Sequence, residues 1–318
     1  MYLAGRAQAK SRFRFFAYES GGGNFLDTAD SYSWKTGNCG GESESIIGSW
    51  LRSRRIRAAM VVATKVGAET GIYKRSLRAD AIITRVEASL RRLGTDYIDI
   101  VYAHMDDSLT SLEETLGTFD QIIRQGKARY LAISNYSLDR ARGVFETCHL
   151  GAFAKPIAIS CQYSLVVRSD YEGIFDCLCA KEKVACLPYW ALAKGFLTGK
   201  YRPGAEVASA RANRAQSYLN AKGLRILEAL EEIGDNRSVC MSSVAIAWLL
   251  NKSAIVSVLA SARTPEQLGE LTTAAGLWLS REEMSLLDSA SEKRECDIES
   301  KESYDPLLWT EDSVNSKH

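Results

Sequence analysis

Seven positions in the sequence, each at the end of an apolar segment, carry side chains that can donate or accept hydrogen bonds. They are Asp27, Lys65, His104, Asn135, Gln162, Tyr189 and Ser261. A carboxylate, an ammonium, an imidazole and a phenol can together hold and move protons, as general acid–base catalysis requires. Any one of these residues, taken alone, is more simply explained as a polar residue where a strand enters a loop. All of them together predict a catalytic site.

The elements that would position these residues alternate as β-α units. Apolar runs rich in β-branched residues predict strands over 24–29, 60–66, 98–104, 129–134, 157–162, 184–189 and 254–260. Helical spacing of apolar residues follows between them, as in Ile82, Val86, Leu90 and Leu93, and in Leu112, Leu116, Phe119 and Ile123. Ser111 and Glu114 predict a capping box. The pattern indicates an α/β protein of the (β/α)8 TIM-barrel type, whose chemistry lies at the carboxyl ends of the strands.

A barrel of this type closes with eight strands, and the sequence predicts seven. The long interval before the last strand contains helical spacing over 224–233 and 241–248, and a loop over 198–216. We therefore expect the first strand to precede Met1 and to be missing, because the chain opens in a predicted helix over 8–20. Such a barrel would expose unpaired strand edges and would be less stable. We predict a single domain over residues 1–318.

Composition excludes several classes of function. The chain has 40 Lys and Arg against 39 Asp and Glu, a net charge of +1, so no global field attracts nucleic acid or an anionic membrane. Its eight cysteines lack C-x-x-C spacing and it has only three histidines, so we predict no metal site and interpret Cys177 and Cys179 as packing residues. No apolar stretch is long enough to span a membrane, and we expect a cytoplasmic protein.

Six segments resemble the aldo-keto reductase family in sequence and in order. They are N-F-L-D-T-A-D-S-Y at 24–32, A-T-K at 63–65, Y-A-H at 102–104, I-S-N at 133–135, L-P-Y-W-A-L-A-K-G-F-L-T-G-K-Y at 187–201 and S-A-R-T-P-E-Q-L at 261–268. The resemblance covers residues 8–290 and leaves 291–318 as a tail. Two departures affect the cofactor stretches: Trp190 and Ala191 replace a common Ser-Pro pair, and Leu271 replaces a common Asn.

The resemblance implies a catalytic tetrad of Asp27, Tyr32, Lys65 and His104. Tyr32 would donate the proton to a substrate carbonyl, and Lys65 would favour its phenolate, because a free Tyr has a pKa near ~10. Asp27 would pair with Lys65 and keep it charged. His104 would donate a hydrogen bond to the carbonyl oxygen. Each residue also has a plain structural interpretation, which for His104 alone would be the better one.

The resemblance also implies NADPH as cofactor. Ser134, Asn135 and Gln162 would hold the nicotinamide carboxamide, and Tyr189 would stack on the ring. Thr264, Pro265 and Gln267 predict a helix start that binds phosphate, and Arg263 beside it would favour NADPH over NADH. Further contacts would come from Trp190, Leu192, Gly195, Lys200, Arg211 and Ser261. No G-x-G-x-x-G follows a strand, so a Rossmann domain is not supported.

The leading hypothesis is therefore an NADPH-dependent oxidoreductase that reduces the carbonyl of a small aldehyde or ketone to the alcohol. The alternative is a nicotinamide-binding subunit that senses redox state and turns over slowly. A metal-dependent barrel hydrolase lacks the ligands. Substrate choice would depend on the loops over 33–41 and 105–110 and on the tail after Cys296, with Trp34 and Trp190 as an aromatic wall.

Overall fold

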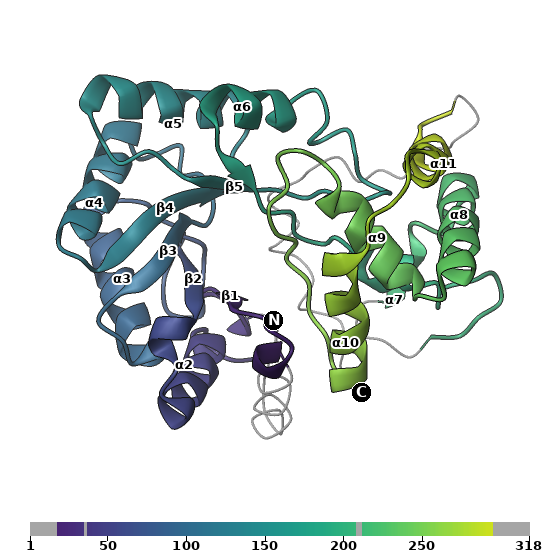
Figure 1. The fold of residues 1–318 in the computed structure, drawn as a ribbon. Helices are drawn as coiled ribbons and strands as arrows, with labels where there is room; N and C mark the ends of the chain where they lie inside the picture. The colour runs from purple at the N-terminus through teal and green to yellow at the C-terminus, as the bar shows by residue number, and fades with distance from the viewer. Residues whose placement is uncertain (1–17, 35–36, 208–211, 295–318) are drawn as a thin grey trace. The chain divides into compact units, whose positions relative to one another are not determined.

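The computed structural model describes residues 18–34, 37–207 and 212–294 (Figure 1). Most of the helix predicted over 8–20 and most of the tail lie outside these residues, although 18–20 are helical. The described chain forms two compact units. The first contains the described residues up to Ser160 together with Lys181–Val184, and the second contains Cys161–Ala180 and the described residues from Ala185 onward.

The first unit is built on parallel strands in sequence order. These are β1 (Phe25–Asp27), β2 (Val61–Val66), β3 (Ile98–Ala103), β4 (Ala128–Ser134) and β5 (Ala158–Ser160). Their β-branched residues, apart from the half-buried Val61, are buried, because helices cover a parallel sheet on its outer side. The predicted parallel α/β organisation is confirmed here, with shorter strands at β1 and β5.

The register of these strands places the predicted catalytic residues on one face. Asp27 pairs with Ala63, two residues before Lys65. Lys65 pairs with Tyr102, two residues before His104. Because side chains on a strand alternate with period two, residues two apart share a face, and so do paired residues on neighbouring strands. Asp27, Lys65 and His104 therefore all project from one face, each two residues further along its strand.

Helices of the first unit follow the strands and pack successively against one another. They are α2 (Glu42–Arg54), α3 (Ala79–Leu93), α4 (Leu112–Arg124) and α5 (Leu138–Gly151), with a short helix η2 (Arg57–Ala59) before β2. The capping box at the start of α4 is only half formed. Ser111 Oγ accepts from Glu114 N at 3.1 Å, but the Glu114 carboxylate accepts from Ala79 N at 2.9 Å. Glu114 thus caps the neighbouring helix α3.

The second unit is mainly helical. Its elements are α6 (Phe175–Glu182), of which 175–180 belong here, β6 (Ala185–Cys186), η3 (Ala193–Thr198), α7 (Ala212–Gln216), α8 (Ala221–Arg237), α9 (Met241–Leu250), α10 (Pro265–Thr273), η4 (Ala274–Gly276) and α11 (Arg281–Ser291). Helix α9 is almost wholly buried and packs against α8 and α10. Trp248 at its centre donates to Asp288 Oδ1 on α11 at 3.0 Å. Helices α8 and α9 match the two predicted from apolar spacing.

Two predictions in this unit are wrong. Residues 254–260 form no continuous strand: Ile255 makes a single parallel bridge to Cys186, and Val256 is 65% exposed. An exposed β-branched side chain gains little stability from strand pairing, so the apolar run predicted a longer strand than the structure contains. The interval 198–216 is also not simply a loop, because it begins in η3 and ends in α7.

Candidate active site

Lys65 on β2 is the centre of the candidate site. Its Nζ donates to the carboxylate of Asp27, to the carbonyl oxygen of Thr28 at 2.9 Å and to Tyr32 Oη at 2.9 Å. The side chain is only 3% exposed. An ammonium has three donors, and here each has an acceptor, which offsets part of the cost of burying the charge. The structure therefore brings three members of the predicted tetrad into direct contact.

Electrostatics at Lys65 reflect its burial. Desolvation lowers the pKa of Lys65 below its ordinary value of 10.5, while the Asp27 carboxylate acts in the opposite direction. Tyr32 Oη is also within hydrogen-bond distance of Asp27 Oδ2, at 3.4 Å. A cation 2.9 Å from a phenol oxygen stabilises the phenolate. The arrangement can therefore assist a proton leaving Tyr32.

His104 follows β3 and completes the group. Its backbone N–H donates to Val66 O at 2.8 Å, and its ring meets that of Tyr32 edge to face, with centroids 6.1 Å apart. The imidazole is 5% exposed. Burial, together with the nearby cations Lys65 and Arg85, holds the pKa of His104 well below 6.5. The ring is therefore neutral near pH 7, with one nitrogen protonated and the other able to accept a hydrogen bond.

Ser134 is the last residue of β4, and Asn135 follows it, beside His104. Both are buried, and Asn135 has a left-handed backbone with φ of 58°. Asn tolerates this conformation better than most residues. Asn135 Nδ2 donates to His104 O at 2.9 Å and to Ser134 Oγ at 3.0 Å. These bonds fix the amide, as a carboxamide-binding group requires.

Sequence reasoning missed a group of buried charges beneath the tetrad. Arg85 on α3 donates from Nε to Asp30 Oδ2 at 2.6 Å and from Nη2 to the carbonyl of Ala68. Burial raises the pKa of Asp30 to about 6, despite the opposing charge of Arg85. Nearby, Glu44 pairs with Arg92 at 2.7 Å. One signal was available, because Arg85 falls next to Val86 on the apolar side of the helix.

In the second unit, Gln162 and Tyr189 are brought together. They form a parallel bridge, and Tyr189 N donates to Cys161 O at 3.0 Å. The rings of Tyr189 and Trp190 are perpendicular, with centroids 5.6 Å apart. Both aromatic side chains are half-buried. An accessible phenol ring can stack on a nicotinamide, and an amide side chain can form hydrogen bonds with its carboxamide.

The segment after Tyr189 has an unusual backbone. Trp190, Ala193, Lys194 and Gly195 all have positive φ, between 47° and 99°. Each non-glycine residue in this region costs of order 1 kcal/mol, so the surrounding structure must hold the segment in place. Within the segment, the N–H groups of Ala193 and Gly195 donate to the carbonyl oxygens of Trp190 at 2.7 Å and of Leu192 at 2.8 Å, so its own hydrogen bonds help to hold these turns. Contact of Leu192 and Gly195 with the cofactor stays a prediction.

The start of α10 forms as predicted. Thr264 Oγ1 accepts from Gln267 N at 3.3 Å, and Pro265 occupies the first helical position. Gln267 Oε1 accepts from Arg263 N at 2.9 Å, so this oxygen is part of the helix cap. Ser261 and Arg263 have exposed side chains beside it. Lys200 is exposed next to the Tyr201 ring. Arg211 lies outside the described residues.

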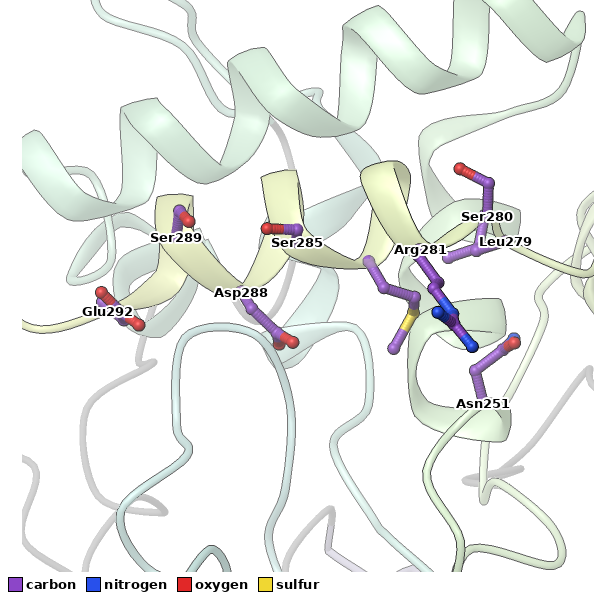
Figure 2. A pocket seen from close by; sticks show the side chains of 9 residues that line it. Asn251, Leu279, Ser280, Arg281, Ser285, Asp288, Ser289 and Glu292 are labelled. Carbon is purple, nitrogen blue, oxygen red and sulfur yellow. The ribbon is translucent and has the colours of Figure 1, made fainter.

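A hollow of about 470 Å³ lies along α11, and Figure 2 shows its nine lining side chains, among them Asn251, Arg281 and Asp288. It contains no predicted site residue, and Asp288 is already bonded to Trp248 and Lys252. Within the described ranges, no group of three or more His, Cys, Asp or Glu could hold a metal ion. Nor is any helix there long and apolar enough to cross a membrane.

Comparison with known proteins gives consistent matches. The family profile described as "Aldo/keto reductase family" matches residues 11–292. L-glyceraldehyde 3-phosphate reductase of Escherichia coli O157:H7 is 32% identical over 277 residues, which is 83% of this chain and 78% of that protein. Norsolorinic acid reductase stcV of Emericella nidulans is 33% identical over 283 residues, 84% and 68% of the two chains. Norsolorinic acid reductase of Aspergillus flavus is 30% identical over 289 residues, 86% and 69%.

Proposed function

Because the chain belongs to the aldo/keto reductase family, we propose that it is an NADPH-dependent enzyme that reduces an aldehyde or ketone to the alcohol. The observation that carries this proposal is the position of Lys65 Nζ, which contacts both the Asp27 carboxylate and Tyr32 Oη. That contact is what a phenol needs in order to act as an acid near neutral pH. The (β/α)8 barrel of the family and a single domain over 1–318 are part of the proposal.

The proton of the reaction comes from Tyr32. Its Oη releases the proton to the carbonyl oxygen of the substrate as the carbonyl carbon is reduced, which leaves a phenolate. The ammonium of Lys65 at 2.9 Å stabilises that phenolate, and Asp27 keeps the ammonium charged and in place. Because Lys65 already has three acceptors, its position does not have to change during the reaction.

His104 orients the substrate. The neutral imidazole donates a hydrogen bond to the carbonyl oxygen and so directs it toward Tyr32 Oη. His104 and Tyr32 are held edge to face, and the Asn135 amide fixes the backbone at His104. The carbonyl oxygen thereby meets a hydrogen-bond donor and an acid from two different loops.

Ser134 and Asn135 would bind the carboxamide of the cofactor. The other residues that we propose to contact the cofactor are Gln162, Tyr189, Trp190, Leu192, Gly195, Lys200, Arg211, Ser261, Arg263 and Gln267. When bound, the reduced nicotinamide would supply the hydride that side chains cannot. Arg263 would pair with the 2′-phosphate, which is why we propose NADPH and not NADH.

The substrate class is part of the proposal. Trp34 packs closely on Gly71, where an added Cβ would lie 3.0 Å from its ring. It stands two residues after Tyr32 and is half-buried, so one of its surfaces remains accessible. An aromatic surface next to the acid favours carbonyl compounds that carry a ring. Two relatives, L-glyceraldehyde 3-phosphate reductase and norsolorinic acid reductase, suggest two further probes, L-glyceraldehyde 3-phosphate and norsolorinic acid.

The test is turnover by the purified full chain. NADPH absorbance is followed with benzaldehyde, L-glyceraldehyde 3-phosphate and norsolorinic acid, and binding of NADPH is measured separately by quenching of tryptophan fluorescence. Carbonyl-dependent oxidation of NADPH is the expected result. Tight binding without turnover would instead support the redox-sensing alternative, and absence of both would contradict the proposal.

A further inference from the structure

Ser31, the residue directly before Tyr32, contacts the imidazole of His104. Its Oγ lies 3.3 Å from His104 Nδ1. This contact joins the turn after β1, which carries Tyr32, to the end of β3. Among the described residues, the Ser31 hydroxyl has the imidazole as its hydrogen-bond partner.

The direction of this hydrogen bond determines which ring nitrogen carries the proton. A neutral imidazole has one N–H, and the hydrogen bond at one nitrogen selects the tautomer at the other. If the serine O–H donates to Nδ1, then Nδ1 has no proton and Nε2 carries it. If Nδ1–H donates to the serine instead, Nε2 is an acceptor and cannot donate to a carbonyl oxygen.

The surroundings of His104 favour a ring with only one protonated nitrogen. The imidazole is 5% exposed, and Lys65 lies on the neighbouring strand with its ammonium directed to Tyr32. A second cation, Arg85, is buried in the same unit. Burial and two cations disfavour a doubly protonated ring, in which both nitrogens would be donors. His104 can therefore donate through Nε2 only if Nδ1 is the acceptor.

We propose that Ser31 is a positioning residue whose hydroxyl donates to Nδ1 of His104, which fixes the proton on Nε2 and directs that N–H to the substrate carbonyl. The inference rests on the proposed function in one respect, the role of His104 as a donor to substrate. The position of the proton on the ring is independent of that role. It can therefore be measured without turnover.

The first measurement is the tautomer of His104 in the full chain labelled with ¹⁵N-histidine. The chain has three histidines, so His149→Gln and His318→Gln variants assign the spectrum. We expect the protonated nitrogen of His104 to couple to both carbon-bound ring protons, which identifies it as Nε2. A protonated Nδ1, coupled to only one of them, would overturn the proposal.

The second measurement compares Ser31→Thr with Ser31→Val. The two replacements are matched in shape and branching, and only threonine retains a hydroxyl. Ser31→Thr should keep the tautomer and the kcat of the parent. Ser31→Val should lose about five- to tenfold in kcat, as expected for one neutral hydrogen bond. Its tautomer should become mixed, while the Kd for NADPH stays unchanged.

The outcomes separate this inference from the proposed function. A parent protein with no carbonyl reductase activity would contradict the function, yet the spectrum would still decide the direction of the Ser31 bond. An active parent whose Ser31→Val variant matches Ser31→Thr in both kcat and tautomer would overturn the inference alone.

Discussion

At the residue scale, the buried ammonium of Lys65 is the group on which the proposed chemistry depends. Its side chain is 3% exposed, and its contacts are the Asp27 carboxylate, the Thr28 carbonyl and the Tyr32 hydroxyl. A purely structural lysine would gain more by reaching solvent, because removing a charge from water is costly. The contact with Tyr32 therefore supports the catalytic role that we propose for the buried charge.

Lys65→Met removes the charge of the side chain and keeps most of its length. We expect kcat/KM to fall by about 10²-fold or more, as for loss of assistance to a general acid. Without the cation the Tyr32 phenolate is less stabilised, so the high-pH limit of activity should move to higher pH. Lys181→Met, which removes an exposed lysine, is the control. A pH profile unchanged from the parent would contradict this role for Lys65.

His104 should make the stability of the protein depend on pH. Its pKa in the folded protein lies well below 6.5, whereas an unfolded histidine titrates near ~6.5. As the pH falls below about 6.5, the unfolded state therefore binds more protons than the folded state does, and the free energy of unfolding decreases. Between pH 7.5 and 5.5 the loss is at most about 1.4 kcal/mol, the amount for one histidine that stays neutral in the folded state.

Urea unfolding at the two pH values tests the stability prediction. His104→Gln should remove that dependence, and His149→Gln, at an exposed imidazole, should retain it. Asp30 is present in all three proteins, so its titration cancels in the comparison. Equal pH dependence in His104→Gln and in the parent would show that the prediction is wrong.

At the element scale, the turn that carries Tyr32 is attached to α3 and β2 by buried polar contacts. Asp30 N donates to Lys65 O at 3.1 Å, and the Asp30 carboxylate pairs with Arg85. Arg85, which is 1% exposed, also binds the carbonyl of Ala68 in the loop after β2. One guanidinium thus holds two loops that flank the tetrad. Five rigid donors suit arginine to this task better than lysine.

Arg85→Met should therefore destabilise the protein strongly. Asp30 would remain buried without its partner, and breaking a buried ion pair in this way costs about 3–5 kcal/mol. The matched control is Arg91→Met on the exposed side of the same helix, which should change stability by less than about 0.5 kcal/mol. Denaturant midpoints measure both. Equal midpoints for the two variants would show that Arg85 does not act as an anchor.

The elements differ in how well the sequence predicts them. Helices α3 and α4 follow from the spacing of their apolar residues, because each buries one continuous stripe. The sequence could not distinguish a strand from an extended segment over 254–260, since apolar β-branched residues occur in both. Only half of the capping box predicted at Ser111 forms, because the Glu114 carboxylate accepts a hydrogen bond from the backbone N–H of Ala79 on another helix. Local patterns do not reveal such tertiary partners.

At the scale of the whole molecule, a net charge of +1 means that any anionic ligand must be held by local groups. Arg263, exposed before α10, is the residue we assign to the 2′-phosphate. Arg263→Ala should raise the Kd for NADPH by about 10- to 100-fold, the range of one charge-assisted hydrogen bond. The Kd for NADH should not change.

Arg281→Ala is the control for the cofactor experiment, because it removes an exposed arginine at the start of another helix. It has the same effect on net charge and should leave both dissociation constants unchanged. Fluorescence titrations at fixed ionic strength measure them. A parallel loss of NADPH and NADH affinity in Arg263→Ala would contradict the assignment to the 2′-phosphate.

The sequence predicts the residues of the candidate site better than it predicts their contacts and backbone conformations. Residue types at strand ends predicted a catalytic site, and the family resemblance implied the tetrad that includes Tyr32. Strand register brings Asp27 and Lys65 to one face. The bond between Ser31 and His104 was not predictable, because it depends on how a turn folds over the end of β3. Nor were the left-handed residues from Trp190 to Gly195, three of which are not glycine.

The central claim is that Tyr32 donates the proton, and Tyr32→Phe tests it most directly. The substitution removes a single oxygen and leaves the ring in place. Steady-state reduction of the best carbonyl substrate by NADPH is compared with Tyr130→Phe, which alters an exposed tyrosine on β4. We predict that Tyr32→Phe loses at least about 10²-fold in kcat with an unchanged Kd for NADPH, and that Tyr130→Phe matches the parent. Retention of parental kcat by Tyr32→Phe would contradict the account.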